Sequence, residues 1–297
     1  MSTRPRNTGA TRQAGAQPPW GGPAPAEAPP ADTTLRGRAL QALHLCDPRQ
    51  KVDAVQALAR ESVELPVDAD ATWPDPGSLP GRPPQMVLVP PAQLARRSPF
   101  TLAGRQALLH ALAHIEFNAI NLALDAMWRF AGMPEAYYRD WLLVAAEEAH
   151  HFSLLCEHLE SLDCRYADLP AHDGLWAMVE KTRGDVLARM ALVPRTLEAR
   201  GLDATPPMQA RLQQAGDHRA VEILAVILRD EVGHVAIGNH WYRFLCAQRG
   251  LDPLAHYAEL ARRHEAPPLR PPFNLEARRR AGFTGEELAL LGRPGET

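Results

Sequence analysis

The stretch LLVAAEEAHHFSLLCEHL, residues 142–159, places two glutamates and two histidines side by side in a segment with the apolar spacing of a buried helix face. Glu148 and His151 fall on the apolar stripe of this helix, whose other members are Val144, Ala145, Phe152, Leu155 and Leu159. An ionised carboxylate is costly to bury without a partner. The segment therefore predicts a buried helix whose acidic side chains are paired with a cation.

The spacing Glu-x-x-His puts two metal-binding side chains almost one turn apart on one helix face. It occurs three times, as Glu147/His150, Glu148/His151 and Glu231/His234. Glu231 and His234 lie on or beside the apolar stripe of a later helix, whereas Glu147 and His150 point toward a wetter face. Two helices thus present Glu-x-x-His toward a core, and we expect Glu147 and His150 to contact the ligands from outside the metal sphere or to lie at the surface.

A two-metal site in a four-helix bundle needs one more carboxylate from each remaining helix. The first helix offers Glu116, which apolar residues flank, and the third offers Glu198 or Glu180. Glu116 and Glu148 are 32 residues apart, Glu198 and Glu231 are 33 apart, and Glu180 and Glu231 are 51 apart. A duplicated helical hairpin predicts matched spacings, and this favours Glu198 over Glu180.

The predicted ligand set consists of four carboxylates and two imidazoles. Zinc prefers sulfur and nitrogen ligands in closed tetrahedral sites, while oxygen-rich ligation with histidine suits iron or manganese. We therefore expect two iron ions, with manganese as the alternative. No catalytic residue beyond the metal ligands is evident.

The chain divides into four parts by composition. We expect a disordered tail rich in proline and alanine over residues 1–33, and two short helices broken at Asp47-Pro48 followed by a proline-rich wrapping segment over 34–100. A four-helix bundle is expected over 101–250, and a helix with a wrapping tail over 251–297. No segment has the pattern of a strand, so the predicted class is all-α.

The bundle helices are expected at about 101–131, 135–162, 174–200 and 208–249. Gly132 and Pro134 separate the first two by a short turn, which predicts an antiparallel pair. Pro194 should kink or interrupt the third helix. The sequence GLDATPP, from Gly201, is expected to break the chain before the fourth helix, in which Gly216 is a candidate interruption.

Composition excludes several classes of protein. The 297 residues are 45% hydrophobic with a net charge of −3, which does not favour a general nucleic-acid or membrane-surface binder. Cys46, Cys156, Cys164 and Cys246 form no CxxC pair and no disulfide framework, and we expect reduced, mostly buried thiols. The sequence has neither an apolar leader nor a run of about 18 apolar residues, so a cytoplasmic location without membrane contact is expected.

Five motifs carry a family resemblance: HIEFNAINLALD, AAEEAHHFSLL, PRTLEARGLD, RDEVGHVAIGNHW and PPFNLEARRRAGF. Over about residues 36–290 the chain resembles the ferritin-like superfamily of di-iron carboxylate proteins, and within it the DUF455 family of unknown function. The resemblance implies a ferritin-like four-helix bundle with metal ligands Glu116, Glu148, His151, Glu198, Glu231 and His234. Pro194, close to Glu198, departs from the usual form of the superfamily.

The leading functional hypothesis is an oxidoreductase of the oxygenase or hydroxylase kind that uses dioxygen. An external electron donor is expected because the sequence has no GxGxxG fingerprint, and a pocket of the protein would choose a small-molecule substrate. The alternatives are a ferroxidase or iron-handling protein, a structural or binding protein without metal, and a tRNA-modifying hydroxylase using the arginines of EARRRAGF, residues 276–283. Structural roles are expected for His110 and His114, structural or solvent-facing positions for His158 and His240, and core packing for Trp141, Trp241 and Tyr242.

Overall fold

The computed structural model describes residues 32–94 and 98–291, and within these residues the chain is all-α. The described residues contain no strand; a single isolated bridge pairs Leu88 with Ala171. The predicted all-α class is therefore confirmed. The tail expected over residues 1–33 lies almost entirely outside the described residues, as does the end of the chain from residue 292.

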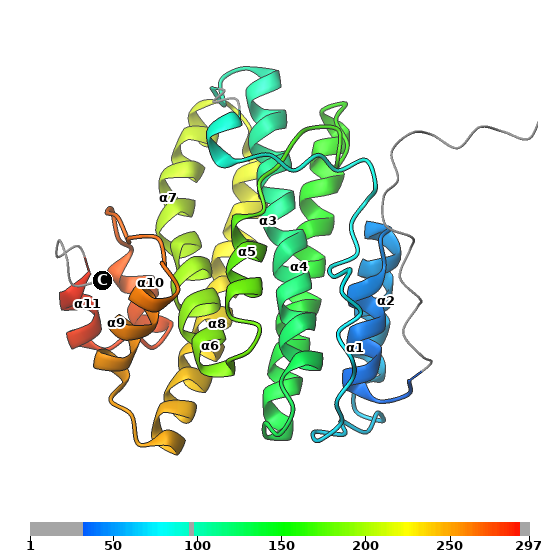
Figure 1. Cartoon of the computed structure of the whole chain (residues 1–297). Helices are drawn as coiled ribbons and strands as arrows, with labels where there is room; N and C mark the ends of the chain where they lie inside the picture. Colours follow the sequence, from blue (N-terminus) through cyan, green and yellow to red (C-terminus); the bar gives the residue numbers. More distant parts are fainter. Residues whose placement is uncertain (1–31, 95–97, 292–297) are drawn as a thin grey trace, which may run out of the picture.

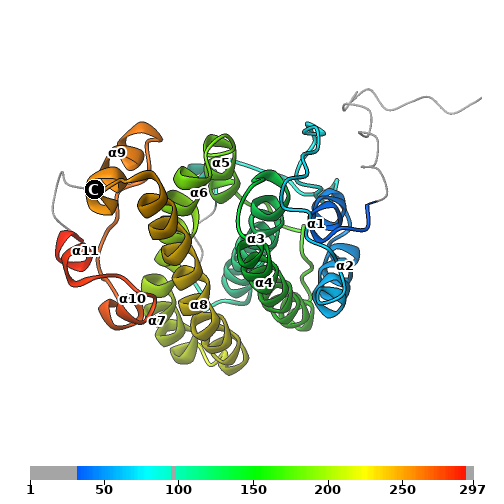
Figure 2. The same cartoon turned by 90° about the horizontal axis from the view of Figure 1, so that it is seen from below.

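Four long helical segments form the centre of the molecule (Figures 1 and 2). Three of them are single helices, α3 (Leu102–Arg129), α4 (Glu135–Ser161) and α8 (His218–Arg249). The fourth is composite and consists of α6 (Val186–Leu192), the π-helix η2 (Val193–Glu198) and α7 (Ala199–Gln214). The main contacts run from α3 to α4, from α4 to α8, and from α8 to α6, η2 and α7.

Shorter helices cover two flanks of this bundle (Figure 2). On one flank, α1 (Leu35–His44) packs on α3 and α2 (Pro48–Glu61) packs on α4. Next to α3 and η2 lies α5 (Gly174–Lys181), and a 3-10 turn, η1 (Pro91–Gln93), interrupts the proline-rich segment. On the other flank, α9 (Pro253–Arg263), α10 (Leu275–Arg280) and α11 (Gly285–Leu290) lie against α6, α7 and α8.

Side-chain caps set the ends of the bundle helices. The side chain of Thr101 accepts a hydrogen bond from the backbone N–H of Gly104 at the start of α3, and the N-cap Asp217 does the same for Ala220 in α8. The helix α8 ends at Gly250, whose φ of 64° lies in the left-handed region that glycine adopts without strain. These local signals produce two helices long enough to carry a ligand motif in their middle.

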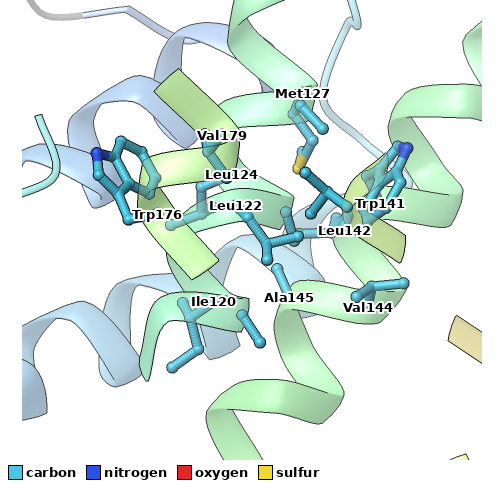
Figure 3. Close-up of a cluster of buried hydrophobic side chains, with 14 of the residues drawn as sticks. Ile120, Leu122, Leu124, Met127, Trp141, Leu142, Val144, Ala145, Trp176 and Val179 are labelled. Carbon is cyan, nitrogen blue, oxygen red and sulfur yellow. The ribbon is translucent and has the colours of Figure 1, made fainter. Parts of the chain in front are cut away.

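Part of the hydrophobic core fills the space where α3, α4 and α5 meet (Figure 3). Leu124 of α3 lies on the side of Val179 and Trp176 of α5, and Met127 of α3 lies toward Trp141 of α4. Of the described helices, α3 is the one long and apolar enough to cross a membrane, with a mean hydropathy of 1.3, but 72% of that window is buried inside the molecule. The apolar surface of α3 is therefore largely used in packing.

The third bundle segment differs from the predicted helix over 174–200. The chain forms α5, leaves the helix at Thr182, and starts α6 at Val186 with Asp185 as the N-cap. At Pro194 the helix neither ends nor simply kinks, because the chain widens there into the π-helix η2 and continues as α7. Proline has no N–H to donate, and a π-turn is one way for a helix to accommodate that loss.

The predicted break at GLDATPP, from Gly201, is wrong, because α7 runs through this stretch to Gln214. Pro206 cannot donate to the carbonyl of Leu202, and the side-chain amide of Asn274 donates to that oxygen instead, at 3.3 Å. The real boundary lies at Gly216, which has a φ of 76°, next to the N-cap Asp217. The predicted interruption at Gly216 is therefore the end of one helix and the start of the next.

The N-terminal helices and the thiols agree with the sequence analysis in most respects. Asp47 is the N-cap of α2 and Pro48 its first residue, so the helices do break at Asp47-Pro48. All four cysteines are free: Cys164 and Cys246 are buried, Cys156 is partly buried, and Cys46 is exposed.

Candidate metal centre

Five of the six predicted ligands form two overlapping clusters in the middle of the bundle. One cluster contains Glu116, Glu148 and His151, and the other contains Glu148, Glu231 and His234. Within each cluster the potential ligand atoms lie within 4.8 Å of one another, and all five residues are buried. Glu148 belongs to both clusters and is completely buried, so it is the carboxylate that the two clusters share.

The first cluster joins α3 to α4. Nδ1 of His151 lies 3.1 Å from Oε2 of Glu148 and 3.7 Å from Oε2 of Glu116. Oε2 of Glu116 has no hydrogen-bond partner although it is buried. Because buried polar atoms nearly always have partners, this oxygen is available to a ligand that the protein binds.

The second cluster joins α4 to α8. Nδ1 of His234 lies 2.9 Å from Oε1 of Glu148 and 3.9 Å from Oε2 of Glu231. The close pair does not have the angles of a hydrogen bond, and Nδ1 of His234, Oε1 of Glu148 and Oε2 of Glu231 are all buried without a partner. These three atoms point into one small region from two helices.

The outer nitrogens of both imidazoles contact acidic residues on the opposite helix. Nε2 of His151 on α4 lies 3.1 Å from Oδ2 of Asp230 on α8, and Nε2 of His234 on α8 lies 2.7 Å from Oε2 of Glu147 on α4. Each acid immediately precedes the cluster glutamate of its own helix. A carboxylate on the far nitrogen holds the proton there and leaves Nδ1 free for a metal.

Glu198 lies at the end of the π-helix η2 and is buried. Neither of its carboxylate oxygens has a partner, and its charge interacts with those of Glu148 and His234. The rival residue Glu180 is instead at the surface, 3.6 Å from the guanidinium of Arg183. Glu198 thus interacts electrostatically with two residues of the second cluster, whereas Glu180 is paired with Arg183; the choice of Glu198 as a ligand stays a prediction.

Burial and mutual repulsion strongly affect the protonation of the carboxylates. Burial, with the charge of Glu148, raises the pKa of Glu116 and of Glu198 to about 8, and that of Glu231 well above its usual value. Burial also opposes ionisation of Glu148, but the charge of His234 and the hydrogen bond with His151 outweigh it, so the pKa of Glu148 is lowered. Without a cation, the site holds one ionised carboxylate among three that retain protons.

The imidazoles are affected in the opposite direction. Burial lowers the pKa of His151, but its contacts with Glu116 and Glu148 outweigh this and raise it to about 11. For His234, burial is again outweighed, by the charge of Glu148 and the contact with Glu147, and its pKa lies well above the usual value. In the metal-free site the ligands therefore carry protons, and a bound metal ion would replace these protons.

The donor set fits two cations of the iron or manganese type. Four carboxylates and two imidazoles offer oxygen and nitrogen but no sulfur, and at least one buried atom of Glu116, Glu148, Glu198, Glu231 and His234 has no partner within the protein. Two divalent ions would neutralise four carboxylates, and buried carboxylates need such compensation.

Comparison with known proteins places the chain in a family. The model of the family described as "Protein of unknown function (DUF455)" matches residues 44–289. The chain belongs to this family. It is also 51% identical, over 213 residues, to an uncharacterized protein of Haemophilus influenzae, an alignment that covers 69% of this chain and 74% of that relative. No solved structure matches the chain.

Three other histidines of this DUF455 chain, His110, His114 and His158, have partners that explain them without a metal. Nε2 of His110 accepts a hydrogen bond from the backbone N–H of Ala167, and Nδ1 of His114 lies 2.9 Å from the hydroxyl of Tyr166. His158 contacts the N-cap Asp217 at 2.8 Å. His150 and His240 are exposed, and Trp141, Trp241 and Tyr242 are buried in the core as expected.

Sequence reasoning missed two residues around the centre. The contact of Glu147 with His234 agrees with the expectation for Glu147, but Asp230 was given no role, although the acid-Glu-x-x-His pattern shared by both helices was a usable signal. Nothing in the sequence indicated that Arg195, three residues before Glu198, is buried. Its partners come from the C-terminal third of the chain and are described below.

Proposed function

We propose that this DUF455 protein is a ferritin-like di-iron oxidoreductase of the oxygenase or hydroxylase kind. One observation carries the proposal: Glu148 is shared by two buried Glu/His clusters contributed by three helices. A pair of iron ions in such a site supplies the electrons that reduce dioxygen. The overlap of the clusters supports two neighbouring metal ions rather than a single structural one.

The residues of the chain would divide the work as follows. Glu148 and Glu231 would bridge or cap the metal pair, and His151 and His234 would each bind one ion through Nδ1. Glu116 and Glu198 would be terminal ligands; Oε2 of Glu116 and both carboxylate oxygens of Glu198 have no hydrogen-bond partner in the protein. Burial of all six side chains keeps bulk water away from the centre, and this strengthens their electrostatic interaction with the cations.

Electrons would enter from an external donor. Glu147 and Asp230 line a surface hollow of about 500 Å3 together with His150 and Arg229. These two acids contact the outer nitrogens of the ligand imidazoles, so this hollow is where the surface comes nearest to the centre through hydrogen bonds. We place the docking of the donor at this hollow.

Iron storage is the alternative function that the experiment must distinguish from an oxygenase or hydroxylase reaction. In a storage cage, compact subunits would contact one another through the sides of their bundles. In this protein two of those sides are covered, one by α1 and α2 and the other by α9, α10 and α11. No residue of the described chain favours a mineral over a substrate. The small-molecule substrate is not identified by the site, because fold and ligand set alone do not determine it.

The test begins with metal content and an optical spectrum of protein from iron-replete cells. We expect about two irons per chain in the wild type and a loss of both in the double variant Glu148→Ala/Glu231→Ala. The reduced protein should then consume dioxygen without taking up further iron. Continued uptake of added iron with formation of a mineral would instead favour storage, and a wild-type protein without metal would exclude the di-iron proposal.

A further inference from the structure

Arg195 is a buried arginine in the π-helix that carries Glu198. Only 4% of its surface is exposed. Its guanidinium donates to the side-chain oxygen of Asn239 on α8, and to Oε1 of Glu287 on α11 at 2.7 Å. Three rings from the C-terminal part of the chain surround it, with centroids 4.9–5.1 Å away; they belong to Tyr242, Tyr257 and Phe283.

Glu287 is itself fixed from three directions. Besides the contact with Arg195, its Oε2 accepts a hydrogen bond from Arg243 on α8 at 2.9 Å. The same oxygen accepts from the backbone N–H of Thr284, whose hydroxyl in turn accepts from the N–H of Glu287. This capping box starts α11, so the carboxylate that holds Arg195 cannot move without disturbing that helix.

The residues on either side of Arg195 are held in the same way. Pro194 packs so closely on α8 that a Cβ at Gly238 would lie 2.5 Å from the Cβ of Pro194. The hydroxyl of Thr196 donates to the carbonyl of Ala191 and lies 2.9 Å from the hydroxyl of Tyr257 on α9. Three consecutive residues of the π-helix are therefore attached to helices that follow it in the chain.

Glu198 needs such support because nothing near it attracts it in the metal-free protein except His234. Its oxygens have no partner, and the charge of Glu148 repels it. A π-turn contains one residue more than an α-turn, so relaxation to an α-helix would rotate Glu198 by about 100° around the helix axis. The contacts at residues 194–196 oppose that rotation.

We propose that Arg195, held by Glu287, is a positioning residue for Glu198, so that the C-terminal helices set the affinity of the second metal position. This inference rests on the proposed metal centre and deepens it. The metal position affected is the one formed by Glu148, Glu231 and His234, since Glu198 lies beside that cluster. The position formed by Glu116, Glu148 and His151 contacts neither Arg195 nor Glu287 and should be unchanged.

The experiment is an anaerobic titration with cobalt(II), followed by its absorption spectrum, which requires no oxygen chemistry. The test variant is Glu287→Gln and the matched control is Glu286→Gln, since Glu286 is the exposed neighbour on α11. We expect the wild type and the control to bind two cobalt ions. Glu287→Gln should bind the first with unchanged affinity and the second about 10–100-fold more weakly, the range for losing an outer support of a ligand.

A milder variant covers the case in which Glu287→Gln does not fold, as judged by circular dichroism. Tyr257→Phe removes the hydroxyl that contacts Thr196 but keeps the ring beside Arg195. It should weaken the second cobalt ion in the same direction. The positioning role would be overturned if the folded variants bound both ions with wild-type affinity. It would also be overturned if the affinities for both ions fell by the same factor. A wild type that binds no cobalt would overturn the metal centre itself.

Discussion

Glu148 and His234 face each other between α4 and α8, with Oε1 of the carboxylate 2.9 Å from Nδ1 of the imidazole and no hydrogen bond between them. The other oxygen of Glu148 lies 3.1 Å from Nδ1 of His151. One carboxylate thus connects two imidazoles that belong to different helices. Because Glu148 belongs to both clusters and Glu116 to only one, substitutions of these two ligands should have different effects on metal binding.

Substitution of Glu148 should affect both metal positions, whereas substitution of Glu116 should affect only one. Glu148→Gln removes the charge common to both clusters, so we expect less than one metal ion per chain, as in a protein with no intact site. Glu116→Gln should retain the ion at Glu231 and His234. The measurement is metal content after dialysis, with Glu157→Gln on the exposed face of α4 as the control. Equal loss in the two test variants would contradict a shared carboxylate.

The outer carboxylates should tune the two positions separately. Asp230→Asn weakens the support of His151, and Glu147→Gln weakens the support of His234. Each change should lower the affinity of one metal ion by about 10–100-fold, because the outer partner fixes the tautomer and orientation of the imidazole. Competition with a chelator measures these affinities. His150→Gln changes the same surface at a residue with no hydrogen bond to a ligand, and it should bind both ions as the wild type does.

Helix periodicity pointed to five side chains that the structure brings together in two clusters, and their role as metal ligands stays a prediction. Glu148 and His151 share a stripe with apolar residues of α4, and that relation depends only on residues a few positions apart. The matched spacing also led to Glu198, although the helix around it is not regular. A ligand set on long, well-formed helices is therefore a local property of the sequence.

Errors arose where distant residues compensate for a local signal. A proline such as Pro206 normally ends a helix. Here α7 continues, because Asn274 donates to the carbonyl of Leu202, which lies 72 residues before it in the chain. The reciprocal contacts of Glu147 and Asp230 likewise depend on how α4 lies against α8. Sequence periodicity describes the faces of helices but not the register between them, so the shared acid-Glu-x-x-His pattern marks these two acids without identifying their partners.

The close approach of Gly238 to Pro194 should make this glycine irreplaceable. In Gly238→Ala the new Cβ would lie 2.5 Å from the Cβ of Pro194, so α8 and η2 must separate. We expect a loss of about 1–3 kcal/mol in the free energy of unfolding, typical of overpacking, together with a weaker second metal ion. Chemical denaturation measures the first effect.

Gly233→Ala is the matched control on the same helix, because a Cβ there meets nothing within 4 Å. Alanine favours a helix over glycine by up to about 1 kcal/mol, so this variant should be as stable as the wild type or more so. If Gly238→Ala behaved like Gly233→Ala, the packing of the π-helix on α8 would not be as tight as described.

The metal-free protein should lose stability as the pH rises from about 4.5 to 8. Glu116 and Glu198 have a pKa near 8 in the folded chain, above the ordinary value of 4.5, because burial and the charge of Glu148 oppose their ionisation. A group whose pKa is raised by folding contributes stability below its unfolded pKa and loses it as the pH passes the folded pKa. His151, with a pKa of about 11, changes in the same direction above pH 6.5.

Two comparisons isolate this effect. Glu116→Gln cannot ionise, so the metal-free variant should be more stable than the metal-free wild type at pH 8 by about 1–3 kcal/mol, the cost of one poorly compensated buried group, and nearly equal to it at pH 5. Thermal unfolding across this pH range, with metal removed by a chelator, measures the difference. Added metal should remove the decline in the wild type, because the cations then pair the carboxylates that the rising pH ionises. A stability that rose from pH 5 to pH 8 without metal would show that these carboxylates have partners other than protons and cations.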